Sequence, residues 1–300
     1  MAPQKRTILI TGFCSEGGAG HALALEFAAQ GLRVFATARS TKSLATLEAK
    51  GIEVFPLDVT KTESIAALKS ELSQRTDGKL DMLFNNAGSM YEMPAIEADS
   101  YKVRTMFDAN VFGLFDMVTA FTPLLLASVS SSTHPPTIIN TSSIVSQVPY
   151  PFSSAYNASK AAVASYSDTL RIELALLGVK VVTVFMGVVS TGITSPDSVN
   201  FGSESLYIDA EEGAEKRSRN HLRDGMKPDD FARRVVNNIL RKSSRAQGEY
   251  VWQGSNAFII WLLNAVGWRK VFDGSMEDGV GLTKEVKQSI YEKGQHGRKE

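Results

Sequence analysis

Tyr156 and Lys160 stand four positions apart at the start of a long helical pattern that begins near Ser154. On a helix, side chains four positions apart lie one above the other on the same face. A tyrosine titrates near pH ~10 in water, and a positive charge beside it stabilises the phenolate and lowers its pKa. Such a pair can exchange a proton with a substrate oxygen near neutral pH. Because Tyr-x-x-x-Lys is frequent by chance, its surroundings must decide whether it is catalytic.

Two further polar residues stand where they could act with this pair. Ser143 follows an apolar, β-prone run at 137–139, so its hydroxyl falls at the end of a predicted strand. Asn110 lies inside a helical pattern over about residues 100–128, where it either belongs to a site or satisfies a kink. Ser143, Tyr156 and Lys160 are therefore candidate catalytic residues, and Asn110 joins them through the family resemblance described below.

Strand and helix patterns alternate along the chain that must position these residues. Apolar, β-prone runs occur at 7–11, 33–38, 53–57, 79–84, 137–139, 180–185 and 249–252. Buried runs that alternate with helices are typical of α/β proteins with a parallel sheet. We expect a doubly wound Rossmann fold: an about seven-stranded, mainly parallel sheet with helices on both faces. The Ser-rich segment 128–136 is expected to be a surface loop within one domain, 1–300.

A glycine-rich turn at 12–20 follows the first predicted strand and leads into an Ala- and Leu-rich helix. In this context, glycines let a dinucleotide approach the backbone, and the helix N-terminus favours its pyrophosphate. Gly12, Gly18 and Gly20 are the candidate contacts. Cys14 falls in the turn, where a small-residue role is expected rather than a reactive thiol. As the only cysteine, it excludes an intramolecular disulfide and fits a reducing compartment.

The end of the second predicted strand bears on the choice of cofactor. A site selective for NAD usually has an acidic residue there, which bonds the ribose hydroxyls of the adenosine. This chain has Ala38 followed by Arg39, whose guanidinium suits the additional phosphate of NADPH. Glu16 would oppose a phosphate only if its side chain pointed inward. A solvated arginine at a helix start is the alternative; we expect NADPH/NADP+.

In this order, these motifs resemble the short-chain dehydrogenase/reductase family over about residues 6–195. Asn85-Asn86-Ala87-Gly88, after the fourth predicted strand, completes the set. Two departures from the family pattern stand out. The family spaces its glycines as T-G-x-x-x-G-x-G, whereas five residues separate Gly12 from Gly18, so the turn is enlarged. Met186 replaces the proline of the family's Pro-Gly-x-Val-x-Thr, although Val189 and Thr191 match it.

The resemblance implies roles for the matching residues. It places Asp58 on the adenine amino group, although Asp58 or Thr60 could instead cap the next helix. It places Thr191 near the nicotinamide carboxamide and Asn110 on a water in a proton relay. The expected cofactor contacts are Gly12, Gly18, Gly20, Arg39, Asp58, Asn86, Ala87, Gly88, Tyr156, Lys160, Val189 and Thr191.

The expected reaction is reduction of a ketone to an alcohol, with NADPH as the hydride donor. Tyr156 supplies the proton to the oxygen, Ser143 hydrogen-bonds that oxygen, and Lys160 lowers the tyrosine pKa and holds the nicotinamide ribose. The substrate is a small carbonyl compound, lipid-like or a secondary metabolite. Two alternatives stay open: a non-redox cyclase or isomerase on the same fold, and a non-catalytic cofactor-binding scaffold.

Composition excludes several other classes of function. The formal net charge is +0 and the pI is about 6.9, so nothing favours nucleic-acid binding. The chain enters its first strand within a few residues, which leaves no room for a signal peptide. No apolar run reaches the ~18 residues that a bilayer span needs. We expect a cytoplasmic enzyme without a metal.

The family resemblance implies a cofactor-binding and catalytic core at 5–195 and a substrate lid in the polar stretch 196–226. Helices and a tail are expected at 227–300. The charged run at 209–223 is expected to be a solvated face without substrate contacts. The apolar segment 257–268, with Trp261 and Trp268, either packs into a core or subunit interface or lies on a membrane surface. This tail and the glycine turn are similar to a fungal subgroup around NADPH-dependent 1-acyldihydroxyacetone-phosphate reductase. That resemblance implies contact with endoplasmic reticulum or lipid droplets, and the family implies a homo-oligomer, dimer or tetramer.

Overall fold

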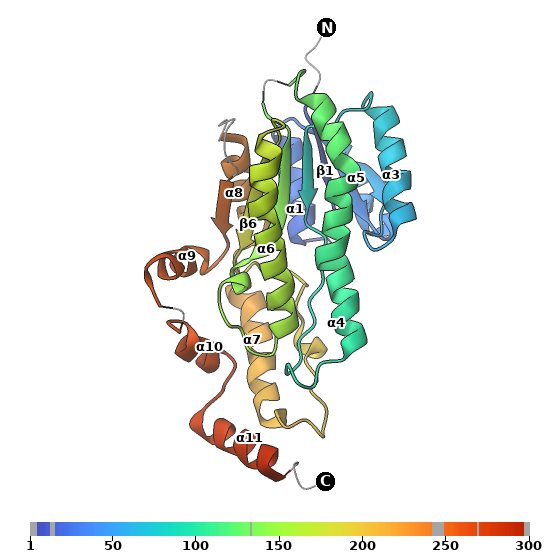
Figure 1. The fold of residues 1–300 in the computed structure, drawn as a ribbon. Coiled ribbons are helices and arrows are strands. Elements are labelled where there is room, and N and C mark those ends of the chain that lie inside the picture. The colour runs from blue at the N-terminus through green and yellow to red at the C-terminus, as the bar shows by residue number, and fades with distance from the viewer. Residues whose placement is uncertain (1–4, 13–15, 133, 242–248, 269, 297–300) are drawn as a thin grey trace.

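The computed structural model describes residues 5–12, 16–132, 134–241, 249–268 and 270–296; Cys14 lies outside them. Their strands form one seven-stranded sheet in the order β3-β2-β1-β4-β5-β6-β7 (Figure 1). All six strand pairs are parallel. The strands are β1 (Thr7–Ile10), β2 (Arg33–Ala38), β3 (Glu53–Pro56), β4 (Met82–Asn85), β5 (Thr137–Ser143), β6 (Lys180–Met186) and β7 (Glu249–Gln253). The predicted doubly wound Rossmann fold is confirmed.

The chain changes direction across the sheet at β1. It runs outward from β1 through β2 to β3, and then returns to place β4 on the other side of β1. The loops after β1 and β4 therefore diverge from neighbouring strand ends. Ligands of doubly wound sheets bind at this switch point, outside the carboxyl ends of the strands.

Helices cover both faces of the sheet (Figure 1). On one face, α1 (Ala19–Ala29) and α8 (Pro228–Arg241) pack their Leu23, Phe27 and Val235 side chains on the strands. On the other face lie α3 (Thr62–Arg75), α5 (Gly113–Ser128) and α6 (Ser154–Ala175), with Phe121 and Val163 in the core. The strands are thus buried on both sides, which is why their sequences read as continuous apolar runs.

The fourth strand begins later than the sequence suggests. It starts at Met82 rather than at residue 79, because the preceding residues are tied to other elements. Leu80 N–H donates to the Leu124 carbonyl. The Asp81 carboxylate accepts hydrogen bonds from the backbone N–H and the hydroxyl of Thr7, at 2.8 and 3.0 Å.

One helical stretch bears on the expectation about membranes. Helix α4 (Ser100–Phe107), a π-helical turn (Asp108–Phe112) and α5 run on as one stretch of 29 residues, within which an 18-residue window has a mean hydropathy of 1.7. By length and composition alone this stretch could cross a membrane, which the lack of an uninterrupted apolar run of ~18 residues in the sequence did not indicate. Leu114, Met117 and Phe121 of this stretch are buried against the sheet.

The remaining elements are α2 (Ala45–Glu48), α7 (Glu211–Asp224), α9 (Ala257–Val266), α10 (Asp273–Gly279) and α11 (Lys284–His296), with short 3-10 turns at Thr41–Leu44, Ile144–Ser146, Pro196–Ser198 and Ile208–Ala210. Leu47 of α2 belongs to the core on the α1 face of the sheet. The sequence indicated neither α10 nor α11. In Figure 1, α9, α10 and α11 form an arm that extends beside the sheet rather than covering a face.

Candidate active site

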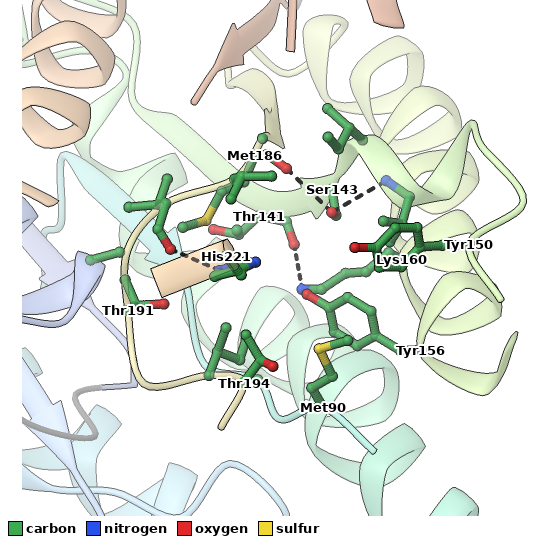
Figure 2. Close-up of a pocket in the computed structure, with 18 of the residues that line it drawn as sticks. Met90, Thr141, Ser143, Tyr150, Tyr156, Lys160, Met186, Thr191, Thr194 and His221 are labelled. Atoms are coloured by element: carbon green, nitrogen blue, oxygen red, sulfur yellow. Dashed lines mark hydrogen bonds between the residues drawn. The ribbon is translucent and has the colours of Figure 1, made fainter. Parts of the chain in front are cut away.

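Ser143 and Lys160 come together because β5 and α6 are bonded to each other at two points. The Ser142 hydroxyl donates to the Lys160 carbonyl at 2.9 Å. The Lys160 Nζ donates to the Thr141 carbonyl at 2.9 Å (Figure 2). Ser143 is the last residue of β5, and its hydroxyl donates to the Met186 carbonyl at 3.2 Å. The strand end and the first turns of α6 are thereby held as one unit.

Tyr156 and Lys160 are both buried and lie on one face of α6, as the four-residue spacing predicts. The Lys160 Nζ lies 5.8 Å from the centre of the Tyr156 ring. Figure 2 shows the ammonium and the phenol side by side at the floor of a cavity, with Ser143 above them. The structure therefore brings these three candidate residues together.

The pKa values of the pair differ from the expectation. Burial raises the pKa of Tyr156 in this structure, whereas the sequence suggested that Lys160 would lower it. Burial also lowers the pKa of Lys160 to about 8. Both shifts have the same cause, since a low-dielectric surrounding disfavours the charged form of each group. Tyr156 is accordingly a protonated phenol at neutral pH.

Asn110 is held by the loop after β4 rather than pointing into the cavity. It stands in the π-helical turn between α4 and α5. Its Oδ1 accepts from Ser89 N–H at 2.8 Å, and its Nδ2 donates to the Ser89 carbonyl at 2.9 Å and to the Ser159 hydroxyl at 3.1 Å. A Cβ on Gly88 would lie 3.1 Å from Asn110 Oδ1 and 3.7 Å from Lys160 Nζ. Asn110 thus fixes the Gly88 loop beside Lys160.

A single cavity joins the candidate catalytic residues to the glycine turn. Its volume is about 490 Å³, within the range of small-molecule clefts. The sequence-predicted residues on its wall are Gly12, Gly18, Gly20, Asn86, Gly88, Ser143, Tyr156, Lys160, Val189 and Thr191. Ala87, Asn110, Arg39 and Asp58 are absent from this wall. The cavity lies at the carboxyl ends of the strands, next to the switch point.

The backbone around the glycine turn fits a dinucleotide. Gly12 has φ +78°, and a Cβ there would lie 2.4 Å from the Ala87 Cα, so only glycine allows this contact. Gly18 occupies the N-cap position of α1 and provides no side-chain cap, so the backbone N–H groups of the first turn are available to an anion as far as the described residues show. His21, in the same turn, is buried and lines the cavity, and its Nδ1 has no hydrogen-bond partner among the described residues. A helix start without a side-chain cap, next to an unpaired imidazole nitrogen, suits a pyrophosphate.

Asn86 has a structural task that the sequence did not indicate. Its Nδ2 donates to the carbonyls of Thr11 and Gly12, at 3.2 and 2.9 Å. The Thr11 hydroxyl accepts from the backbone N–H groups of Asn86 and Ala87, at 3.0 Å each. These bonds tie the loop after β4 to the glycine turn after β1 and keep the switch point in one conformation.

The residues expected at the adenosine end lie outside the cavity wall. Asp58 Oδ1 accepts from the Thr60 N–H and hydroxyl, at 3.0 and 2.7 Å. These hydrogen bonds, together with the charges of Lys61 and Arg39, lower the Asp58 pKa. Neither Asp58 nor Thr60 caps α3, because Lys61 occupies the N-cap position. Arg39 is exposed, near enough to Asp58 to stabilise its charge.

One face of α7 corrects the expectation of a solvated charge run. Arg217, Ser218 and His221 line the cavity, and Arg217 and Ser218 are buried. The His221 Nε2 bonds to the Val189 carbonyl at 2.9 Å, and burial is the main cause that lowers the His221 pKa. Together with the buried Ala214, these positions have the i, i+3, i+4, i+7 spacing of one helical face. This spacing could have indicated from the sequence that one face of the charged run is buried.

Arg217 is the centre of a buried polar cluster. It forms an ion pair with Glu92, and the two side chains are 7% and 3% exposed. Its guanidinium lies 4.5 Å from the centre of the Tyr150 ring, and burial lowers its pKa to about 10. Thr194 donates to Glu92 Oε2 at 3.2 Å and shares a 2.5 Å hydrogen bond with Ser218. The cluster joins α7 to the loops that follow β4, β5 and β6.

Similarity to known proteins assigns the chain to a family. The sequence model described as short chain dehydrogenase matches residues 6–200. The chain is 39% identical over 276 residues to the short-chain dehydrogenase virD of Hypocrea virens, covering 91% of this chain and 92% of that protein. The chain belongs to the short-chain dehydrogenase/reductase family. This family member is 44% identical over 191 residues to the NADPH-dependent 1-acyldihydroxyacetone phosphate reductase of Schizosaccharomyces pombe, covering 64% and 62% of the two chains.

A solved structure extends the likeness to the whole fold. The short-chain dehydrogenase from Streptomyces avermitilis aligns with a TM-score of 0.73 at 27% identity, over 93% of this chain and 100% of that chain. The resemblance seen in the motifs of residues 6–195 is confirmed over nearly the same residues. The chain is therefore an oxidoreductase of the short-chain dehydrogenase/reductase family.

The buried ion pair generates a prediction about stability. Glu92→Gln leaves Arg217 as a buried cation without its counter-charge, so the free energy of unfolding should fall by about 3 kcal/mol. The matched control is Glu215→Gln, which removes an exposed i,i+4 pair with Arg219 and should change stability by at most about 0.5 kcal/mol. Urea unfolding of both variants measures the difference. Equal effects would contradict the burial of the Glu92 pair.

Proposed function

We propose that this oxidoreductase is an NADPH-dependent reductase that converts a ketone to an alcohol. The observation that carries the proposal is the convergence of Ser143, Tyr156 and Lys160 on the cavity that also contains the uncapped start of α1. A site with hydroxyl donors at one end and an anion-binding helix start at the other suits a carbonyl beside a nicotinamide dinucleotide.

NADPH, when bound, supplies the hydride that the carbonyl carbon receives. The Tyr156 phenol donates its proton to the carbonyl oxygen as negative charge develops there. Its raised pKa keeps that proton in place until an alkoxide, a much stronger base than a phenolate, forms. The Ser143 hydroxyl hydrogen-bonds the same oxygen, and the Lys160 cation stabilises the phenolate that remains. Asn110 keeps the Gly88 loop against Lys160. In this proposal it also holds a water molecule of the proton relay.

The cofactor is proposed to lie along the cavity from α1 to α6. Gly12, Gly18, Gly20, Asn86, Ala87 and Gly88 hold its pyrophosphate and central part, and Val189, Thr191, Tyr156 and Lys160 hold the nicotinamide end. Arg39 and Asp58 extend the site beyond the cavity wall to the adenosine. The exposure of Arg39 leaves its guanidinium accessible to a phosphate, and the name of the S. pombe relative includes NADPH.

The substrate is proposed to carry an apolar portion, lipid-like or that of a secondary metabolite. Beyond Ser143 the cavity wall includes the apolar side chains of Ile144, Val145, Val148, Ile260 and Met276. Several of these side chains belong to one hydrophobic cluster that α9 and α10 complete. We further propose that 5–195 form the cofactor-binding and catalytic core, that 196–226 are the substrate lid, and that 227–300 complete one domain.

We also propose that copies of the chain associate into a dimer or tetramer. Ile172 on α6, Leu176 directly after that helix and Phe112 in the π-helical turn are more than half exposed, at 62%, 86% and 54%. Apolar side chains of this size on an outer helix face favour association with a second copy.

The exposed face of α9 supports a proposal of peripheral membrane contact. The inner face of α9, formed by Ala257 and Ile260, packs on Ile144 and Val148 beside the cavity. The packing into a core that the sequence allowed for this segment therefore applies to that face alone. The exposed apolar side chains are Phe258 (70%), Ile259 (53%), Trp261 (44%), Leu262 (41%), Val266 (75%) and Trp268 (73%). Tryptophans favour the headgroup region, and Lys270 adds attraction to anionic lipid. The chain is accordingly proposed to be cytoplasmic and peripheral to endoplasmic reticulum or lipid droplets.

The catalytic proposal predicts the behaviour of Tyr156→Phe. The substitution removes the proton donor with little change of volume, so turnover should fall by at least about 10²–10⁴-fold while the NADPH dissociation constant stays the same. The loss of reduced-nicotinamide absorbance over a panel of ketones measures turnover. Near-normal reduction by this variant would remove Tyr156 from the mechanism.

The cofactor proposal predicts a change of selectivity in Arg39→Asp. An aspartate repels the additional phosphate of NADPH, so the NADPH dissociation constant should rise far more than that of NADH. Arg33→Asp is an unsuitable control because Arg33 is paired with Glu53. Lys42→Asp makes the same change of charge nearby, and Lys42 forms no ion pair with the residues that the structure describes. Fluorescence titration gives both constants. Equal affinity of the unmodified protein for NADH and NADPH would contradict the role of Arg39.

The membrane proposal predicts binding to vesicles of phosphatidylserine and phosphatidylcholine. The unmodified chain should co-sediment with them, and Trp261→Glu should weaken the binding without changing the melting temperature. Ile96→Glu is the matched control, since Ile96 is 74% exposed away from α9 and its substitution should leave binding unchanged. Recovery of the unmodified chain in the supernatant would contradict the proposal.

A further inference from the structure

Tyr150 places a second phenol on the wall of the cavity that holds Tyr156. The residue lines the cavity and stands in the loop between β5 and α6. Figure 2 shows its side chain extending into the cavity on the same side as Ser143 and above Tyr156. Among the residues that the structure describes, no group forms a hydrogen bond with its hydroxyl. Burial raises the Tyr150 pKa to about 12, so the hydroxyl keeps its proton.

The ring of Tyr150 is held in place from two directions. Asn157 Nδ2, in the first turn of α6, donates to the Tyr150 carbonyl at 3.0 Å. The Arg217 guanidinium lies over the ring at 4.5 Å and donates to the Pro151 carbonyl at 3.4 Å, and Glu92 pairs with the same guanidinium. The backbone is therefore fixed by the helix that carries Tyr156, and the ring by a buried cation.

The contacts of Arg217 and Glu92 are better explained as a means of orienting the Tyr150 ring than as a means of stabilising the fold. A buried ion pair contributes little net stability, because desolvation offsets the attraction of its charges. Tyr150 is half-buried and its ring lines the cavity, so its hydroxyl can donate to a substrate oxygen there in place of water. In the proposed mechanism Ser143 and Tyr156 both form hydrogen bonds with the carbonyl oxygen that is reduced. The Tyr150 hydroxyl can therefore donate a hydrogen bond to a different oxygen of the substrate. Glu92 neutralises Arg217, so the subsite offers a neutral donor rather than a positive charge.

We propose that Tyr150 is a specificity-determining residue that donates a hydrogen bond to a second, uncharged oxygen of the substrate, such as an ester or second carbonyl oxygen. The inference rests on the proposed reductase function and narrows its substrate class to oxygenated ketones. Arg217 acts through the ring as a positioning residue.

Tyr150→Phe tests the inference with pairs of ketones that differ by one oxygen. Ethyl 3-oxobutanoate and 4-ethoxybutan-2-one form such a pair, since the second lacks only the ester carbonyl oxygen. The variant keeps the ring and its contact with Arg217, so it should fold and bind NADPH as before. KM for the oxo ester should rise about 10-fold with kcat little changed, while KM for the ether ketone stays within about 2-fold. Tyr101→Phe, at an exposed position on α4, should change neither constant.

The outcomes separate the inference from the function on which it rests. An equal rise of KM for both ketones, or no change for either, would overturn the role of Tyr150 while the reductase function stands. If the unmodified protein does not reduce these two ketones, another pair that differs by one oxygen is chosen from the ketones that it does reduce. If it reduces no ketone of either kind, the proposed function fails and the inference falls with it. Arg217→Lys should raise KM for the oxo ester alone, because a lysine keeps the charge but not the planar contact with the ring.

Discussion

The hydrogen bond from the Lys160 ammonium to the Thr141 carbonyl is the contact on which the candidate site depends. It places a cation in the interior, at the end of a central strand, and the burial that lowers its pKa to about 8 is the same burial that raises the pKa of Tyr156. The Ser142 hydroxyl bonds to the Lys160 carbonyl and fixes the helix against the strand in the same place. A proton donor and a cation are thus held at fixed positions on rigid elements, and positioning of this kind is what the protein can add to chemistry supplied by a cofactor.

Two further devices extend that rigid unit to the rest of the cavity. On the cofactor side, Asn86 ties the loop after β4 to the glycine turn, where only glycine fits at position 12. On the substrate side, the Glu92–Arg217 pair joins α7 to the loops after β4 and β5. Apolar side chains of α9 and α10 close the remaining wall. The cavity has few polar side chains, and hydrogen bonds hold most of them in one orientation. Such a site binds its ligand in one orientation and gains specificity from it.

Much of this arrangement could be predicted from the sequence. Apolar runs alternating with helical patterns give the parallel sheet, and the placement of Ser143 at a strand end and Tyr156 and Lys160 on one helix face follows from local periodicity. The Glu92–Arg217–Tyr150 cluster could not be predicted in the same way, because it joins residues far apart in sequence and one of them lies in a run that reads as a solvated surface. The opposite pKa shift of Tyr156 was missed for a related reason: sequence spacing shows the neighbouring charge but not the depth of burial. The π-helical turn at Asn110 likewise depends on tertiary contacts, with Ser89 and Ser159.

The central claim is that a hydride passes from NADPH to a ketone carbon in the cavity that Tyr156, Ser143 and Lys160 line. The most direct measurement uses NADPH that carries deuterium at the transferable position of the nicotinamide, with a ketone that the protein consumes and mass spectrometry of the product. The account predicts an alcohol with a single deuterium on its carbinol carbon, formed in step with the oxidation of NADPH. A product without deuterium, or an isomerised or cyclised product formed while NADPH is not consumed, would contradict it.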